Sequence, residues 1–186
     1  EENAEIIKYP HNDDVEPDIP SVDSNKRGWH KVGSDWVYYD SRGVLATGWL
    51  NVGQTWYYLR DSGIMATGWV SVSGSDYYFD GSGAMQTGWL KQNTTCHTDI
   101  ADRGSWYYLH ESGIMATGWE QVQDVWYLMS DSGAMLTGWQ YLYGTWYFFQ
   151  NSGAMLTGWL YDNGAWYYLE DSGAMATGWE TVNETR

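Results

Sequence analysis

Several residue types are scarce in this sequence of 186 residues, and each scarcity excludes a class of protein. The single cysteine, Cys96, cannot form a disulfide within the chain. Nine basic residues stand against 24 acidic ones, and the net charge of −15 argues against binding to nucleic acid or to a membrane surface through a basic segment. Because no run of about 18 apolar residues is present, the sequence predicts no transmembrane segment. Trp (14) and Tyr (16) carry the apolar content, so we do not expect a conventional aliphatic core.

The first 26 residues differ from the rest of the chain. They hold all three prolines (Pro10, Pro17 and Pro20), and the acids there far outnumber the bases. A segment of this composition, without apolar periodicity, cannot bury enough surface to fold alone. We therefore expect residues 1–26 to form a disordered acidic linker.

From residue 27 onward the sequence repeats. The dipeptide Gly-Trp recurs every 20 residues, except for one interval of 30 between Trp89 and Trp119, which indicates a ten-residue insertion in the fourth unit. A second Trp follows seven residues later in most units, and Ser-Gly-x-Met follows in most of them. The spacing predicts seven units over residues 27–179, with residues 180–186 as the start of a further, truncated unit.

Each unit has the pattern of a β-hairpin followed by a loop. In residues 49–59, two short aromatic and β-branched stretches flank a turn that contains Gly53. No sustained helical periodicity is present, and 20 residues cannot bury a face alone. We therefore expect an all-β repeat solenoid of stacked β-hairpins without a long helix.

Alternation along the strands sorts the side chains of a hairpin into two faces. If Trp49 and Trp56 face each other across the turn, then Tyr58 lies on their side. Leu50, Val52, Tyr57 and Leu59 then lie on the opposite side and make the better core. A bulge in the turn would exchange the two faces.

The aromatic face is richer than the packing of thin hairpins requires. Exposed aromatic clusters mark binding sites. Three rings around one point suit a quaternary ammonium ion, which is attracted by the ring faces and needs no hydrogen bond. The excess of carboxylates also favours a cationic ligand.

The motifs Thr-Gly-Trp, Trp-Tyr-Tyr-Leu and Asp-Ser-Gly-Ala-Met at a 20-residue period resemble the choline-binding repeat, a cell-wall-binding repeat of streptococcal and pneumococcal surface proteins and murein hydrolases. The resemblance covers about residues 27–179. It implies a left-handed solenoid in which choline binds between adjacent repeats, between two Trp of one repeat, a Tyr of the next and a Met. Carried onto this chain, it assigns four choline sites: Trp29, Trp36, Tyr58 and Met65; Trp49, Trp56, Tyr78 and Met85; Trp119, Trp126, Phe148 and Met155; Trp139, Trp146, Tyr168 and Met175.

Two further sites are expected to be impaired. At Trp69, Tyr108 and Met115 the second Trp is replaced by Asp76. At Trp89, Trp106 and Met135 the expected Tyr is replaced by Leu128, and the insertion interrupts the hairpin.

No catalytic or metal site is predicted. The insertion holds Cys96, His97, Asp99 and Asp102, but one Cys and one His without a second ligand pair are a weak zinc signal. No Ser-His-Asp arrangement can be assembled, and a regular solenoid has no cleft for a glycosidase carboxylate pair. We expect a chain without enzymatic activity or cofactor, and any catalytic domain would lie outside it.

The resemblance implies a cell-surface module that holds a secreted protein on the phosphocholine of teichoic and lipoteichoic acids. A carbohydrate-binding aromatic array is the alternative, because sugars also stack on Trp, although a sugar site needs several hydrogen-bonding side chains. A third role, as an adhesin whose Cys96 loop contacts a host protein, is compatible with choline binding.

Overall fold

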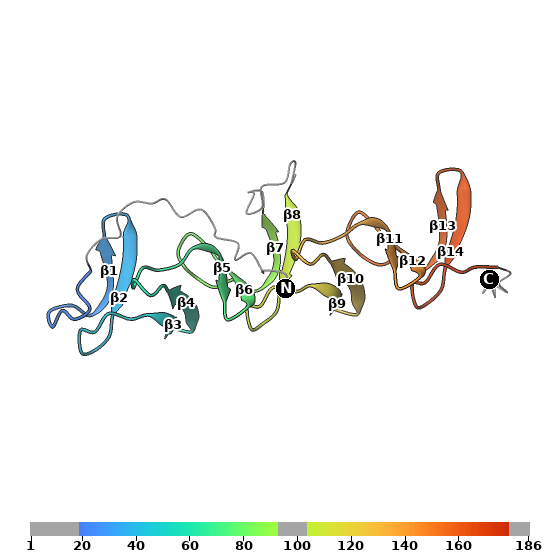
Figure 1. The fold of residues 1–186 in the computed structure, drawn as a ribbon. Coiled ribbons are helices and arrows are strands. Elements are labelled where there is room, and N and C mark those ends of the chain that lie inside the picture. The colour runs from blue at the N-terminus through green and yellow to red at the C-terminus, as the bar shows by residue number, and fades with distance from the viewer. Residues whose placement is uncertain (1–18, 93–103, 179–186) are drawn as a thin grey trace, which may run out of the picture. The chain divides into compact units, whose positions relative to one another are not determined.

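The computed structural model describes residues 19–92 and 104–178, and within them the chain is all-β. The strands pair consecutively into seven antiparallel two-stranded hairpins, which confirms the predicted repeats of β-hairpins without a long helix (Figure 1). We number the hairpins one to seven in chain order. Their strands are β1 (Gly28–Val32), β2 (Asp35–Tyr39), β3 (Gly48–Val52), β4 (Thr55–Leu59), β5 (Gly68–Val72), β6 (Ser75–Phe79), β7 (Gly88–Gln92), β8 (Ser105–Leu109), β9 (Gly118–Val122), β10 (Val125–Met129), β11 (Gly138–Leu142), β12 (Thr145–Phe149), β13 (Gly158–Asp162) and β14 (Ala165–Leu169).

The described residues form two compact units. The first contains hairpins one to three together with residues 109–114, and the second contains nearly all of hairpins four to seven. The Cys96 insertion and the truncated repeat at 180–186 lie outside the described residues.

The register of hairpin two shows which side chains share a face. Trp49 lies opposite Tyr58 and Asn51 opposite Trp56, whereas Leu50 lies opposite Tyr57. The turn residues Gly53 and Gln54 both have positive φ (59° and 69°), as a two-residue turn with the right-handed twist of the strands requires. The predicted faces are therefore confirmed: Trp49, Trp56 and Tyr58 share the outer face, and Tyr57 and Leu59 share the inner face.

The last residue of each second strand is the main core position. It is completely or almost completely buried in every hairpin, and its side chain varies in shape while remaining apolar. No polar or charged side chain is buried among residues 19–92 and 104–178. The residues at this position are Tyr39, Leu59, Phe79, Leu109, Met129, Phe149 and Leu169.

A tight turn follows each hairpin and returns the chain to the next one. In the turn after β6, the Asp80 carboxylate accepts hydrogen bonds from the backbone N–H groups of Ser82 (2.8 Å) and Ala84 (3.1 Å) and from the Ser82 hydroxyl (2.5 Å). These bonds, led by the one from the Ser82 hydroxyl, lower the pKa of Asp80 below its ordinary value. The ionised carboxylate therefore stabilises this turn.

We expect the stability of the chain to depend on the charge of Asp80. Because its folded pKa is depressed, its contribution is present above the unfolded pKa of about 3.9 and is lost as the pH falls through the folded pKa. The difference in thermal midpoint between the parent and Asp80→Asn should therefore be present at pH 7 and shrink below about pH 4. A difference that is the same at pH 7 and well below the folded pKa would contradict a role for the charge.

Within each compact unit, consecutive hairpins are joined by a backbone hydrogen bond near an aromatic pair. In the first unit, Met85 N–H donates to the carbonyl of Trp56 at 2.8 Å, across one hairpin boundary. In the loops that form this bond, the methionine thus lies beside the second Trp of the preceding hairpin. The corresponding bonds join Met65 to Trp36, Met135 to Trp106, Met155 to Trp126 and Met175 to Trp146.

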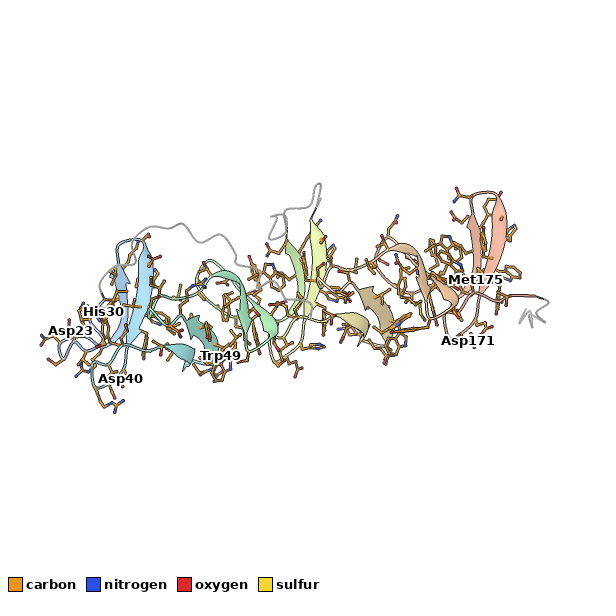
Figure 2. All side chains as sticks on the ribbon, in the orientation of Figure 1. Asp23, His30, Asp40, Trp49, Asp171 and Met175 are labelled. Atoms are coloured by element: carbon orange, nitrogen blue, oxygen red, sulfur yellow. The ribbon has the colours of Figure 1, made fainter. Side chains whose placement is uncertain are left out.

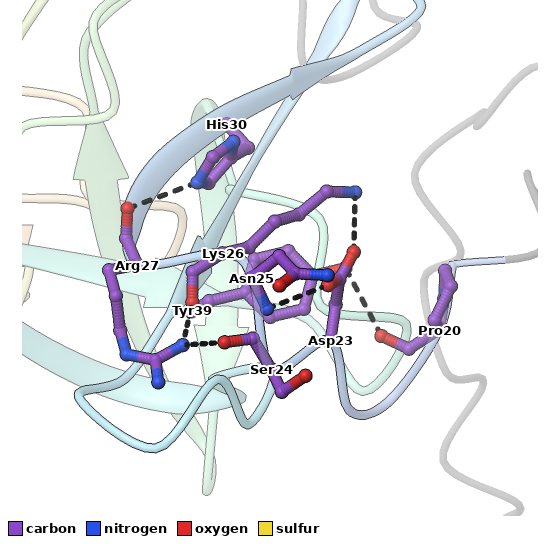
Figure 3. A network of polar contacts seen from close by, with 8 residues as sticks. All are labelled: Pro20, Asp23, Ser24, Asn25, Lys26, Arg27, His30 and Tyr39. Carbon is purple, nitrogen blue, oxygen red and sulfur yellow. Dashed lines mark hydrogen bonds and ion pairs between the residues drawn. The ribbon is translucent and has the colours of Figure 1, made fainter.

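The end of the predicted linker packs on hairpin one (Figure 3). Val22 forms a β-bridge with Val44, and the Tyr39 hydroxyl donates to the Pro20 carbonyl at 3.1 Å. Lys26 Nζ lies 3.4 Å from the Asp23 carboxylate and 5.3 Å from the centre of the Tyr39 ring. Residues 20–26 therefore belong to the folded region rather than to the linker, while residues 1–18 lie outside the described part of the chain.

Candidate functional site

An aromatic cage forms where hairpin six meets hairpin seven. The rings of Trp139 and Trp146 stand edge to face with their centres 6.2 Å apart, and Tyr167 of the next hairpin lies 4.9 Å from Trp139. Met175 closes the set, and the four residues line a cavity of about 330 Å³. Figure 2 labels Met175 in the loop after β14. No amide or carboxyl group lines this cavity, which therefore suits a small ligand that needs no hydrogen bonds.

The same arrangement recurs between other consecutive hairpins. We number each cage by the hairpin that supplies its tryptophans, so the cage at hairpin six is the sixth cage. The fourth cage encloses about 390 Å³. The cages other than the sixth consist of Trp29, Trp36, Tyr57 and Met65 (first), Trp49, Trp56, Tyr77 and Met85 (second), Trp89, Trp106, Tyr127 and Met135 (fourth), and Trp119, Trp126, Tyr147 and Met155 (fifth).

The tryptophans and methionines of these cages are the predicted ones, but the third ring is a different residue. The sequence-based assignment named Tyr58, Tyr78, Phe148 and Tyr168. The structure instead places Tyr57, Tyr77, Tyr147 and Tyr167, each one position earlier, at 4.8 to 5.0 Å from the first Trp of the preceding hairpin.

The reason is the direction of stacking. The outer face of one hairpin meets the inner face of the next, so the third ring must come from an inner-face position. Tyr58 lies on the outer face, where it packs against Trp49 of its own hairpin at 5.4 Å. Tyr78, Phe148 and Tyr168 likewise pack on Trp69, Trp139 and Trp159 of their own hairpins.

The fourth cage is the one whose expected composition this correction changes most. Leu128 is not its third ring, because Tyr127 lies 4.7 Å from Trp89 and supplies that wall. Trp106 stands 6.4 Å from Trp89, and Met135 donates its backbone N–H to the Trp106 carbonyl. The site that the sequence suggested was impaired therefore has three rings and a methionine.

The third predicted site remains a prediction. Trp69 packs against Tyr78 of its own hairpin at 5.3 Å, and Asp76 lies opposite Ser71. Tyr108 and Met115 belong to the other compact unit, where Tyr108 lies 5.1 Å from Trp89.

Repetition within the chain was a signal that could have identified the correct tyrosine. The inner-face position is Tyr in hairpins two to seven (Tyr57, Tyr77, Tyr107, Tyr127, Tyr147 and Tyr167), whereas the next position varies. In hairpin one, which no hairpin precedes among the described residues, the inner-face position is Val37. Among the described hairpins, the tyrosine therefore occurs wherever another hairpin precedes it in the sequence, even after hairpin three, in which Asp76 replaces the second Trp.

The outer tryptophans remain accessible. Trp146 is 42% exposed, while Trp159 and Trp166, against which no described hairpin packs, are 57% and 66% exposed. A following hairpin thus covers only part of each ring and leaves an opening through which a ligand can enter.

Comparison with known proteins identifies the repeats. The family described as choline-binding repeat matches residues 26–67, 66–98 and 136–179, and a family of putative cell wall binding repeats matches residues 100–115 and 117–135. The chain belongs to the choline-binding repeat family. Repeats of this family are a non-catalytic type of module.

Solved structures of Streptococcus pneumoniae proteins are similar to this chain over 81% of its length. They include CbpJ from strain TIGR4 (40% identity, TM-score 0.73), choline binding protein F in the presence of a peptidoglycan analogue (38%, 0.70) and the choline-binding domain of CbpL (27%, 0.51). The match covers 52% of CbpJ, 52% of choline binding protein F and 87% of the CbpL domain, so this chain spans about half the length of the first two. Comparison with curated protein sequences finds no match.

The described residues also bear on metal binding and on membrane crossing. Within residues 19–92 and 104–178, no three His, Cys, Asp or Glu side chains are grouped so that they could hold a metal ion. In the same part of the chain, no helix has the length and apolar character needed to cross a membrane.

Proposed function

We propose that this chain is a non-catalytic, cell-wall-binding module that holds a secreted protein on the bacterial surface. The observation that carries this proposal is the recurrent cage of two Trp, one Tyr and one Met between consecutive hairpins. Such a cage surrounds a trimethylammonium group with ring faces and an apolar sulfur. This group forms no hydrogen bonds, so it needs no polar partner in the cage.

The ligand is the choline of phosphocholine-bearing wall polymers, the teichoic and lipoteichoic acids. Family membership supports choline, and the similarity to choline binding protein F, whose structure was solved with a peptidoglycan analogue, supports the cell wall. A host-protein contact through the Cys96 loop is not part of this proposal, because that loop lies outside the described residues.

A glucan-binding array is a weaker explanation of the same rings. The sixth cage is lined by Trp139, Trp146, Tyr167 and Met175, of which the Tyr hydroxyl and the Trp N–H groups are the only side-chain hydrogen-bonding groups. A sugar ring with several hydroxyl groups needs more polar partners than this lining offers.

Attachment to the wall is expected to depend on several weak sites acting together. Rings that contribute about 0.5–2 kcal/mol each give a single-site affinity on the order of millimolar, or about −4 kcal/mol. Several cages on one polymer raise the overall affinity through effective concentration.

The experiment is retention on a resin of tertiary or quaternary amines. We expect free choline to elute the protein and dextran not to elute it. A variant with Trp36→Ala and Trp146→Ala should elute at a lower choline concentration, because two cages each lose a wall. Equal elution by dextran and choline would refute the proposal.

A further inference from the structure

The side chain opposite the second Trp of each hairpin changes from one cage to another. It lies on the outer face, directly across the strand pair from that Trp. In hairpin six it is Tyr141, opposite Trp146, and in hairpin five it is Gln121, opposite Trp126. In hairpin four the corresponding residue, two positions after Trp89, is Lys91. The residue at this position can therefore determine which chemical group, next to the bound cation, each cage recognises.

Lys91 places a positive charge beside the fourth cage. Its Nζ lies 5.7 Å from the centre of the Trp106 ring. Lys91 is the only lysine or arginine among the described residues of the second unit, and it makes no ion pair with any described residue. A cation that rests on a wall of the cage without an acidic partner among the described residues is available to an anion.

The opening of the fourth cage also carries neutral hydrogen-bond donors. Besides the three rings and Met135, Asn151 and Ser152 line this cavity. An amide N–H and a hydroxyl can both donate to a phosphate oxygen, and none of the described residues that line the cavity carries a carboxylate to repel it.

The sixth cage has the opposite electrostatic character. Tyr141 replaces the lysine and packs on Trp146 at 5.0 Å. The Asp162 carboxylate accepts a hydrogen bond from the Trp139 indole at 3.0 Å, so a negative charge touches the cage wall. The position of Asp162 in the repeat is occupied by Val122 in the hairpin that closes the fourth cage.

We propose that the fourth cage recognises phosphocholine as a whole, with the ammonium between the rings and the phosphate bound by Lys91, and that the sixth cage prefers choline without its phosphate. The two-carbon link of phosphocholine keeps its phosphate near the mouth of the cage when the ammonium lies inside. Charge-assisted hydrogen bonds from a lysine and from neutral donors suit a phosphate oxygen. This inference rests on the proposed choline binding of the cages.

The test compares choline and phosphocholine by titration calorimetry of the full chain. The Trp106→Ala variant removes the fourth cage, so its difference from the parent reports that cage. We expect the fourth cage to bind phosphocholine about three- to fivefold more tightly than choline, as a partly exposed charge pair allows. Lys91→Gln should remove this preference by weakening the binding of phosphocholine, and Lys91→Arg, which keeps the charge, should retain it.

A gain of function provides a second measurement. Tyr141→Lys should raise the relative affinity of the sixth cage for phosphocholine, and combining it with Asp162→Asn should raise it further. If Lys91→Gln changes the affinities for both ligands equally, or tightens choline binding because the lysine had covered the ring, the inference is wrong. If neither ligand distinguishes the parent from Trp106→Ala, the proposed function fails at this cage.

Discussion

We expect Tyr167→Ala to weaken the proposed choline binding at the sixth cage about tenfold, and Tyr168→Ala to leave that cage nearly unchanged. The two residues are neighbours on β14 but point to opposite faces. Tyr167 lies 4.9 Å from Trp139 of the preceding hairpin, whereas Tyr168 packs on Trp159 of its own hairpin at 5.1 Å. Loss of one ring that faces a cation costs about 0.5–2 kcal/mol.

The measurement is titration calorimetry with choline, with Trp146→Ala as the variant that identifies the contribution of the sixth cage. Tyr167→Phe is the matched control, because it keeps the ring face and removes only the hydroxyl. It should bind almost as tightly as the parent. A larger loss in Tyr168→Ala than in Tyr167→Ala would restore the assignment made from the sequence.

Replacing Gly153 with alanine should destabilise the second unit by about 2 kcal/mol. Two causes combine at this position. Gly153 has φ of 83°, which L-residues rarely adopt, and a Cβ there would overlap the sulfur and methyl of Met135. Because Met135 also closes the fourth cage, its displacement should weaken ligand binding there as well.

Gly158→Ala separates these two causes. Its φ of 82° lies in the same left-handed range, which strains an L-residue, but a Cβ there would meet no atom within 4 Å. We expect it to cost about 1 kcal/mol in urea or thermal denaturation, the part due to strain alone. Equal losses in the two variants would show that the contact with Met135 is unimportant. In a Gly153→Ala, Met135→Ala double variant, the loss should be smaller than the sum of the two single losses, because the smaller side chain removes the overlap.

The architecture could be predicted because it depends on local signals that recur. The two-residue turn at Gly53 and Gln54 determines the pairing of β3 with β4, and alternation then places Trp49, Trp56 and Tyr58 on one face. The larger separation of β7 and β8 along the sequence follows from the count of residues in the same way. None of these inferences needs information from beyond a single hairpin.

The folded state of residues 20–26 could not be predicted in this way. Their composition resembles a linker, and their order depends on contacts with a distant loop, such as the bridge between Val22 and Val44. The main-chain bond from Asp23 N–H to the Gly43 carbonyl, at 2.8 Å, adds to this attachment. The composition of a segment indicates how much surface it can bury by itself. It does not indicate the contacts that a distant segment makes with it.

Sequence alone determined the repeat, the hairpins, their two faces, and the tryptophans and methionines of the cages. Tertiary structure decided which tyrosine completes each cage. Adjacent tyrosines such as Tyr57 and Tyr58 both suit a ring wall, and alternation within one hairpin assigns them only to opposite faces. The choice between them is made when the outer face of one hairpin packs against the inner face of the next, which brings Tyr57 to Trp29 and leaves Tyr58 beside Trp49.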